Sequence, residues 1–350
     1  MEKNRIQWLD FARTIAILLV VLTHATETIY NNELYNAGGG ADLIDIIIAS
    51  TSFVMGRMGV PLFLFISGFL LLGRNFDGLK DIFYFYKNHL LPLFFTNLIW
   101  VVIYNIFNLL FFNVSFPNIS ILIQEFLALR IVPKMWHMWF ITCIFGMYLL
   151  LPVLAIMIKK LPKYLVNACV IIALILFFGI PTMNTFFKAL GGYAFSTIEQ
   201  IYWFAPWFCV YPVIGKLCSK KICMMAFPIC LFATVSTQLY LLLSSGQLLW
   251  YNNILVFTTS LVFFRNFASI SRDCIYRVEK VTQFISRRAF AIFYVHMILR
   301  HIMTDFILTI NSYRSVLLIG FTLLCFALSI IIIFMLEKIE VLRRILLYIK

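Results

Sequence analysis

An arginine and a histidine lie in the first apolar segment of the chain, at a spacing that puts them on one helical face. Arg13 and His24 are eleven positions apart, which in an α-helix is three turns plus about 20° and an axial separation of roughly 16 Å. Asp10 and Glu27 fall within about 60° of the same stripe. Ionisable side chains in a membrane-spanning helix are costly and usually face the protein interior or a water-filled cavity. The stripe therefore predicts an enclosed polar site.

The side chains of this stripe suit transfer chemistry. A neutral imidazole can take the proton of a hydroxyl near neutral pH, or it can carry an acyl group itself. The stripe fits a long phosphorylated donor that enters from the cytoplasm, with Arg13 at its phosphates or at a nearby acid and His24 at its reactive end. The competing interpretation is an interfacial Asp10–Arg13 ion pair beside a His24 that only packs. Four ionisable groups on one stripe favour the site.

The composition requires a membrane as the main solvent. Hydrophobic residues make up 63% of the 350 residues, charged residues make up 12%, and the mean hydropathy is +0.95. A soluble domain is nearer half apolar and a quarter charged. Several apolar runs reach the roughly 20 residues that cross a bilayer as a helix. We therefore predict an all-α, polytopic membrane protein, which excludes soluble and nucleic-acid-binding classes.

The apolar runs predict about ten membrane-spanning helices in a single domain over residues 1–350. The expected spans are 7–27, 43–72, 89–112, 137–158, 164–183, 200–216, 223–244, 248–265, 288–310 and 314–336. The second span is too long for a simple crossing and contains Gly56, Gly59 and Pro61. A helix that is broken near these residues is expected there.

The placement of the basic residues predicts an orientation. The net charge is +13, yet the segments that would face outward hold few of the 28 Lys and Arg residues, namely Arg130, Lys134, Lys188, Arg300 and Arg314. By the positive-inside rule, both termini lie in the cytoplasm. The most charged segment, around 266–287, is expected to be a cytoplasmic loop that sets topology. Its Arg and Lys side chains could also hold the phosphates of a cofactor.

Four motifs in the expected order carry a family resemblance. They are Arg13-x10-His24 within Leu9-Asp10-x-x-Arg13; Arg57-Met-Gly-Val-Pro-Leu-Phe63 with Ile66-Ser67-Gly68; Trp136-His137-Met138-Trp139-Phe140 leading to Tyr148-Leu-Leu-Leu-Pro152; and Ile285-Ser286-Arg287 leading to Phe293-Tyr294-Val295-His296. Together they resemble the membrane acyltransferase type 3 family, from residue 6 to about 336. The layout is most similar to its short stand-alone members, such as the enterobacterial common antigen O-acetyltransferase.

The resemblance implies a membrane O-acyltransferase of the bacterial inner membrane. Its donor would be acetyl-CoA or another short acyl-CoA, and its acceptor a hydroxyl of a cell-envelope glycan or lipid-linked sugar. The functional arginine and histidine of the family correspond to Arg13 and His24, and Arg57 corresponds to an arginine commonly found before Val-Pro-Leu-Phe. The Arg-x-x-Arg motif of some members is absent before the third span, where only Lys87-Asn-His89 occurs.

These considerations predict a set of site residues. His24 and Arg13 are expected to be catalytic; Arg13, Arg57, Lys87, Arg287 and Arg288 to bind the donor; and His137, Trp139, Tyr294, His296 and Glu27 to bind the acceptor. His137 would contact a sugar while Trp139 stacks on its pyranose face; the alternative is that His137 belongs to an interfacial aromatic belt. The eight cysteines have no CxxC spacing, so we expect no metal. The alternative from another class is a transporter or flippase of lipid-linked glycans, whose pathway the same stripe would line.

Overall fold

The computed structural model describes residues 6–31, 34, 42–193, 207–218, 223–270 and 272–347. No strand occurs in these ranges, so the predicted all-α class is confirmed. The helices in chain order are α1 (Gln7–Ile29), α3 (Leu43–Arg57), α4 (Gly59–Leu71), α5 (Leu79–Phe85), η1 (Tyr86–Leu90), α6 (Leu91–Phe112), α7 (Ile119–Phe126), η2 (Trp136–Met138), α8 (Trp139–Lys160), α9 (Lys163–Leu174), η3 (Ile175–Gly179), α10 (Ile180–Ala189), α12 (Trp207–Leu217), α13 (Ala226–Ser245), α14 (Ile254–Phe267), α15 (Arg272–Thr309), α16 (Arg314–Leu336) and η4 (Leu342–Leu346).

Eight helical stretches of the described chain are long and apolar enough to cross a membrane. They are Gln7–Ile29, Leu43–Leu71, Leu79–Phe112, Trp136–Lys160, Lys163–Ala189, Ala226–Ser245, Cys274–Thr309 and Arg314–Leu336. The two remaining predicted spans coincide with shorter apolar helices, Phe208–Leu217 and Ile254–Phe267. Residues 200–206 of one of these predicted spans lie outside the described residues. The polytopic membrane architecture is thus confirmed, while the exact number of crossings stays a prediction.

The second span is broken, as the sequence predicts. The break falls at Met58, which ends α3 and precedes α4. A Cβ added at Gly59 would lie 2.8 Å from the carbonyl oxygen of Ala16, and one at Gly56 would lie 2.5 Å from Oγ1 of Thr23. Because only glycine permits this approach, the two glycines bring the break, and Arg57 between them, directly against α1.

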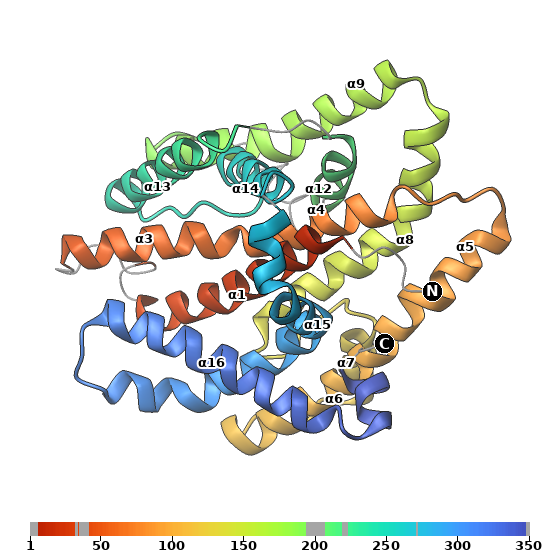
Figure 1. Ribbon diagram of the computed structural model, residues 1–350. Helices are drawn as coiled ribbons and strands as arrows, with labels where there is room; N and C mark the ends of the chain where they lie inside the picture. Colours follow the sequence, from red (N-terminus) through yellow and green to blue (C-terminus); the bar gives the residue numbers. More distant parts are fainter. Residues whose placement is uncertain are drawn as a thin grey trace.

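Helix α1 runs through the interior of the bundle and parallel to α15. In Figure 1 it lies between α3 on one side and α15 and α16 on the other. Arg13 bonds to Ser286 and Thr28 bonds to Arg300, at sequence separations of 273 and 272. Because the separation is nearly constant, the two helices advance in the same direction. Residues that share a face of α1 therefore meet a matching series along α15.

The segment around 266–287 is not the loop that the sequence predicts. Helix α15 begins at Arg272 and continues for 38 residues to Thr309, roughly 57 Å of helix. The prediction was wrong because an apolar-run criterion ends where the charges begin, whereas a helix can extend beyond the bilayer with its charged residues in water. Lys280, Arg287 and Arg288 consequently have fixed positions on a rigid element.

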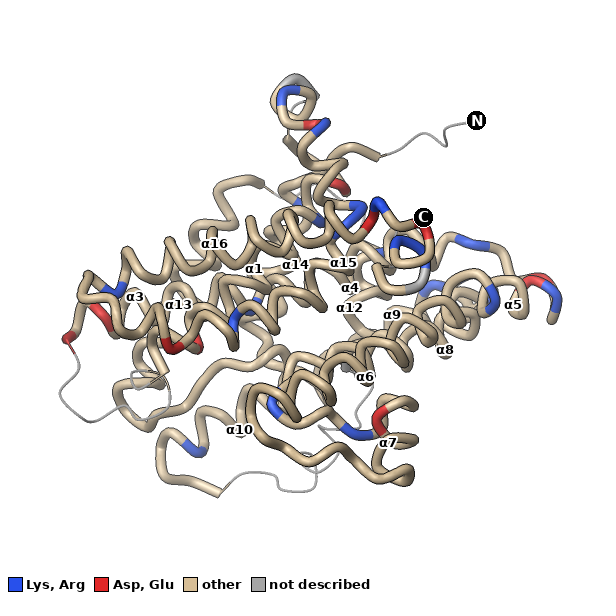
Figure 2. Tube along the Cα trace, turned by 90° about the horizontal axis from the view of Figure 1, so that it is seen from below, with Lys and Arg blue, Asp and Glu red and all other residues tan. Residues whose placement is uncertain are grey.

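The charges are unevenly distributed over the molecule. In Figure 2 the Lys and Arg residues are concentrated toward the side that holds α5, the start of α15 and the C-terminus, and they are sparse along the middle of the bundle. This distribution agrees with the charge asymmetry of the sequence. The cytoplasmic location of both termini stays a prediction.

Candidate active site

His24 and Glu27 form a hydrogen-bonded pair on α1. Nδ1 of His24 lies 3.0 Å from Oε2 of Glu27, and the two residues are one helical turn apart, so both side chains project from the same face. The second oxygen of the carboxylate, Oε1, accepts a hydrogen bond from Nη2 of Arg57 at 2.7 Å. The carboxylate therefore connects a base to a cation.

Arg57 is deeply buried and held on several sides. It is 3% exposed, and its Nη1 donates to the hydroxyl of Tyr251 at 3.0 Å. Its guanidinium carbon lies 4.5 Å from the ring centroid of Phe53 and 4.4 Å from that of Trp250. These cation–π contacts, together with Glu27 as the counter-ion, compensate the free-energy cost of burying the Arg57 charge. The geometry makes Arg57 a residue that positions Glu27.

Three imidazoles from different elements meet beside this pair. The ring centroids of His24 and His296 are 5.4 Å apart, those of His137 and His296 are 5.6 Å apart, and those of His24 and His137 are 6.2 Å apart. The side chains come from α1, η2 and α15. The structure thus brings together three histidines that the sequence analysis placed in the site.

The hydrogen-bond partners of His24 and His296 determine which ring nitrogen carries the proton when each imidazole is neutral. A carboxylate can only accept, so Nδ1 of His24 carries the proton toward Glu27. A carbonyl can only accept as well, so Nδ1 of His296 carries the proton toward the Ile292 oxygen at 2.9 Å. In both rings Nε2 is therefore left with a free lone pair.

The contact with Tyr104 gives His137 the opposite tautomer, in which Nε2 carries the proton. The Tyr104 hydroxyl has one proton, which it donates to the Tyr294 carbonyl at 2.7 Å. Its oxygen also lies 3.1 Å from Nε2 of His137. That nitrogen must therefore donate, and Nδ1 of His137 keeps the lone pair.

The two deeper imidazoles each present an unused acceptor. Nδ1 of His137 and Nε2 of His296 are buried and have no hydrogen-bond partner in the described chain. Buried polar atoms are rarely left in this state unless a ligand or water completes them. Together with Nε2 of His24, they make an acceptor-rich site that matches a ligand with O–H donors. Across the described residues no set of three or more His, Cys, Asp or Glu side chains is arranged to hold a metal ion.

Arg13 lies further along the same face of α1, in a separate network. Its Nη1 donates to Oγ of Ser286 at 3.0 Å, and Oγ of Ser286 donates to Oδ1 of Asp10 at 2.7 Å. Arg13 and Asp10 themselves are 3.7 Å apart. Arg13 and His24 both face α15, as the helical spacing predicts, but Arg13 does not take part in the hydrogen bonds of the imidazoles.

The other predicted residues occupy different surroundings. Trp139 lies beside the site, with its ring 5.0 Å from that of Tyr251. Tyr294 is fully buried and stacks on Trp100 at 5.0 Å, so it contributes its carbonyl oxygen and its packing to the site. Lys87 is exposed on the π-helical segment η1. Arg287 and Arg288 line a pocket at the start of α15.

Three residues of the site escaped the sequence analysis. Tyr104 and Tyr251 are two of the 16 tyrosines in a chain that is 17% aromatic, so nothing in their type or spacing distinguishes them. Arg300 was placed at the outer interface, whereas its Nε donates to Oγ1 of Thr28 at 2.7 Å, one turn of α15 beyond His296. The signal that could have found Arg300 is its spacing of four from His296 on a helix.

Comparison with known proteins adds one match. A protein-family model described as an acyltransferase domain matches residues 6–338 of the chain. Comparisons with curated proteins and with solved structures found no match.

Proposed function

Because the chain belongs to the acyltransferase 3 family and is an acyltransferase that transfers groups other than aminoacyl groups, we propose that it moves a short acyl group, acetyl in the first instance, from cytoplasmic acyl-CoA to a hydroxyl of a cell-envelope glycan or lipid-linked sugar. The observation that carries this proposal is the Glu27 carboxylate, which binds His24 with one oxygen and Arg57 with the other.

This arrangement supports general base catalysis by His24. Glu27 holds Nδ1–H and thereby leaves Nε2 as the basic atom. The same carboxylate would stabilise the imidazolium that forms when Nε2 takes a proton. Arg57 prevents Glu27 from turning away. No second base is required among these groups.

The proposed step balances without an oxidant or metal. The acceptor oxygen attacks the thioester carbonyl carbon while its proton moves to Nε2 of His24. The new C–O bond forms, the C–S bond breaks, and the proton passes to the departing sulfur to give the free thiol of CoA. In a two-step variant, Nε2 attacks the thioester first; the C–S bond breaks as the acyl-imidazole forms, and the Nδ1 proton passes to the departing sulfur. The acceptor oxygen then attacks the acyl carbon, the C–N bond breaks as the new C–O bond forms, and the acceptor proton returns the imidazole to its neutral form. The two routes differ in whether an acyl-imidazole forms.

The acceptor is proposed to bind at the unused imidazole nitrogens. Nδ1 of His137 and Nε2 of His296 can each accept a hydrogen bond from a hydroxyl, and sugars supply several hydroxyls on one ring. Trp139 offers an aromatic surface next to Tyr251 on which an apolar sugar face can pack. We further propose the bacterial inner membrane as the location, with acyl-CoA taken from the cytoplasm.

The test uses the full chain in membranes with a histidine-matched control. Membranes containing the wild type, His24→Ala or His301→Ala are incubated with radiolabelled acetyl-CoA, and label is counted in the glycan fraction. His301 binds the Lys134 carbonyl at 3.0 Å and takes no part in the imidazole network. We expect the His24 variant to fall to background and the His301 variant to retain activity.

Two results would contradict the proposal. Undiminished labelling by a correctly inserted His24→Ala protein would remove the histidine mechanism. An absence of label together with glycan movement that depends on an ion gradient would instead favour the transporter alternative.

A further inference from the structure

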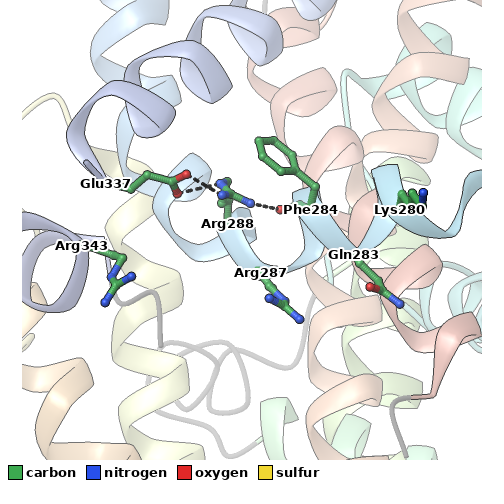
Figure 3. A pocket seen from close by; sticks show the side chains of 7 residues that line it. All are labelled: Lys280, Gln283, Phe284, Arg287, Arg288, Glu337 and Arg343. Atoms are coloured by element: carbon green, nitrogen blue, oxygen red, sulfur yellow. Dashed lines mark hydrogen bonds and ion pairs between the residues drawn. The ribbon is translucent and has the colours of Figure 1, made fainter. Parts of the chain in front are cut away.

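A basic pocket lies where the start of α15 meets the segment after α16. Its volume is about 430 Å³, within the range of small-ligand sites. The residues that line it are Lys280, Gln283, Phe284, Arg287, Arg288, Glu337 and Arg343, shown in Figure 3. Four of these side chains are cationic and one is a carboxylate, so the pocket carries an excess of positive charge.

Arg288 and Glu337 neutralise each other and form the rigid wall of this pocket. Nε and Nη2 of Arg288 donate to the two carboxylate oxygens of Glu337 at 2.9 and 2.6 Å. Nη1 donates to the Phe284 carbonyl at 2.8 Å, and the guanidinium carbon lies 3.6 Å from the Phe284 ring. Since Arg288 is satisfied in this way and Arg343 has Glu340 as a carboxylate neighbour at 3.8 Å, the excess charge belongs mainly to Lys280 and Arg287.

Arg287 and Lys280 are open to a ligand. Both side chains are exposed, and neither has a hydrogen-bond or ion-pair partner in the part of the chain that the structure describes. Lys280, Gln283 and Arg287 follow one another at intervals of three and four residues, which puts them along one face of α15. In Figure 3, Gln283 and Arg287 extend toward the same side of the pocket, and Arg343 extends toward it from η4. The donors therefore come from two elements, although Nη2 of Arg343 also lies 3.8 Å from Oε1 of Glu340.

We propose that this pocket binds the phosphate groups of an anionic ligand. Guanidinium groups match phosphate oxygens in geometry and charge, and an ammonium adds a third donor set. Arg13 is a weaker candidate for the same task, because Asp10 and Ser286 already engage it. Resting on the proposed function, the ligand is the nucleotide end of acyl-CoA.

The height of the pocket along α15 agrees with that assignment. Arg287 and His296 are nine residues apart on one continuous helix, an axial distance of roughly 14 Å, but at about 100° per residue their side chains project from opposite faces of that helix. A donor held by its phosphates at Arg287 would therefore have to cross to the side of α15 that faces α1, where Ser286 contacts Arg13, for its thioester to reach the imidazoles. An anionic phospholipid headgroup offers the same phosphate chemistry from the bilayer, and the experiment separates the two sources.

The experiment measures binding, without turnover, to the full chain in nanodiscs of neutral lipid. The ligands are CoA, dephospho-CoA and pantetheine, and the variants are Arg287→Gln, Lys280→Gln and the charge-matched control Arg277→Gln. Arg277 is exposed on the same helix but does not line the pocket. We expect Arg287→Gln to weaken CoA binding about tenfold, the loss of one charge-assisted contact. Pantetheine binding and the control should stay within about twofold of the wild type.

A second arm uses native mass spectrometry of protein from nanodiscs that contain phosphatidylglycerol. Loss of bound phosphatidylglycerol in Arg287→Gln, with CoA binding unchanged, would support the phosphate site and overturn its assignment to the donor. Unchanged binding of both ligands would overturn the phosphate site. Because neither arm needs acyl transfer, a failure here is distinct from loss of activity in His24→Ala, and a monodisperse Arg287→Lys protein that retains CoA binding would exclude misfolding as the cause.

Discussion

The imidazole rings of His24 and His296 lie 5.4 Å apart, although one belongs to α1 and the other to α15. The parallel packing of these helices brings the imidazole that Glu27 holds next to a buried ring with an unused acceptor atom. In the proposed mechanism, this contact is the place where an acceptor hydroxyl meets the base.

Glu27→Gln is expected to reduce acyl transfer by up to about 10⁴-fold, the effect known for the loss of a carboxylate that orients a catalytic histidine. His24 and Arg57 donate to different oxygens of the carboxylate, and in glutamine an NH2 group, which donates, replaces one of these oxygens, so one of the two contacts is lost. Initial rates of label incorporation measure the effect, and Glu125→Gln, a buried carboxylate outside the site, is the control. Nearly wild-type rates for Glu27→Gln would contradict the role of the carboxylate.

Arg57→Lys should lower kcat about 10²-fold while leaving the affinity for CoA unchanged. Lysine cannot reproduce the planar fork that contacts Glu27 and Tyr251 together. Steady-state kinetics and CoA binding separate the two quantities. A weaker CoA affinity with kcat preserved would instead restore the interpretation of Arg57 as a phosphate-binding residue.

Tyr104→Phe is expected to release the tautomer of His137. The hydroxyl that accepts from Nε2 of His137 disappears, and the Tyr294 carbonyl loses its donor. Solid-state ¹⁵N NMR of labelled histidine should show the Nε2–H form of His137 in the wild type and a mixture in the variant. Stability should fall by about 1–3 kcal/mol, because buried polar atoms are left unsatisfied. An unchanged tautomer would rule out control by Tyr104.

Gly56→Ala should destabilise the bundle by about 1–3 kcal/mol and impair activity. The added methyl group would lie 2.5 Å from Oγ1 and 2.9 Å from Cα of Thr23, so α3 must move away from α1 and take Arg57 with it. Gly320→Ala on α16 is the matched control, since nothing lies within 4 Å of its Cβ. Thermal unfolding in detergent distinguishes the two, and equal midpoints would contradict the close packing.

Glu125 should make stability depend on pH. It is 1% exposed and accepts a hydrogen bond from Asn105 at 2.8 Å. Burial raises the pKa of the Glu125 carboxyl above its usual range. A carboxyl whose pKa is higher in the folded state stabilises the fold at low pH, and this contribution is lost as the pH rises through the folded pKa.

Glu125→Gln tests this dependence because glutamine keeps the acceptor for Asn105 and cannot ionise. We compare the unfolding midpoint of the variant with that of the wild type at each pH. The variant's midpoint relative to the wild type should be about 1–2 °C higher at pH 8 than at pH 5. A difference between the two proteins that stays the same at both pH values would show that Glu125 does not titrate in this interval.

The sequence predicts the helices better than their contacts. Apolar runs locate the spans, and Gly56 and Gly59 locate the break, because both depend on local composition. The length of α15 is missed, since charge along a helix outside the bilayer looks like a loop. The sequence predicts Arg57 as a site residue, but its pairing with Glu27 depends on how α3 meets α1, and no local pattern encodes that approach.

The histidines of the site are a similar case. His24, His137 and His296 stand out because ionisable residues are rare in apolar segments. Which nitrogen of each ring is free follows only from neighbours such as Tyr104 and Ile292, which the sequence does not mark. The membership of these histidines in one site could thus be expected from residue types, whereas the proton positions on their rings required the structure.

One uninterrupted helix, α15, carries both Arg287 and His296. Peptide geometry, rather than the setting of a hinge or loop, fixes the interval between them. With the donor phosphates bound at Arg287 and the thioester carbon required near His296, the length of the helix between these residues would set the length of donor that the site accepts. The protein would select donors by the distance between their phosphates and their thioester. Insertion of one helical turn between Arg287 and His296 should therefore move the thioester out of register with the base.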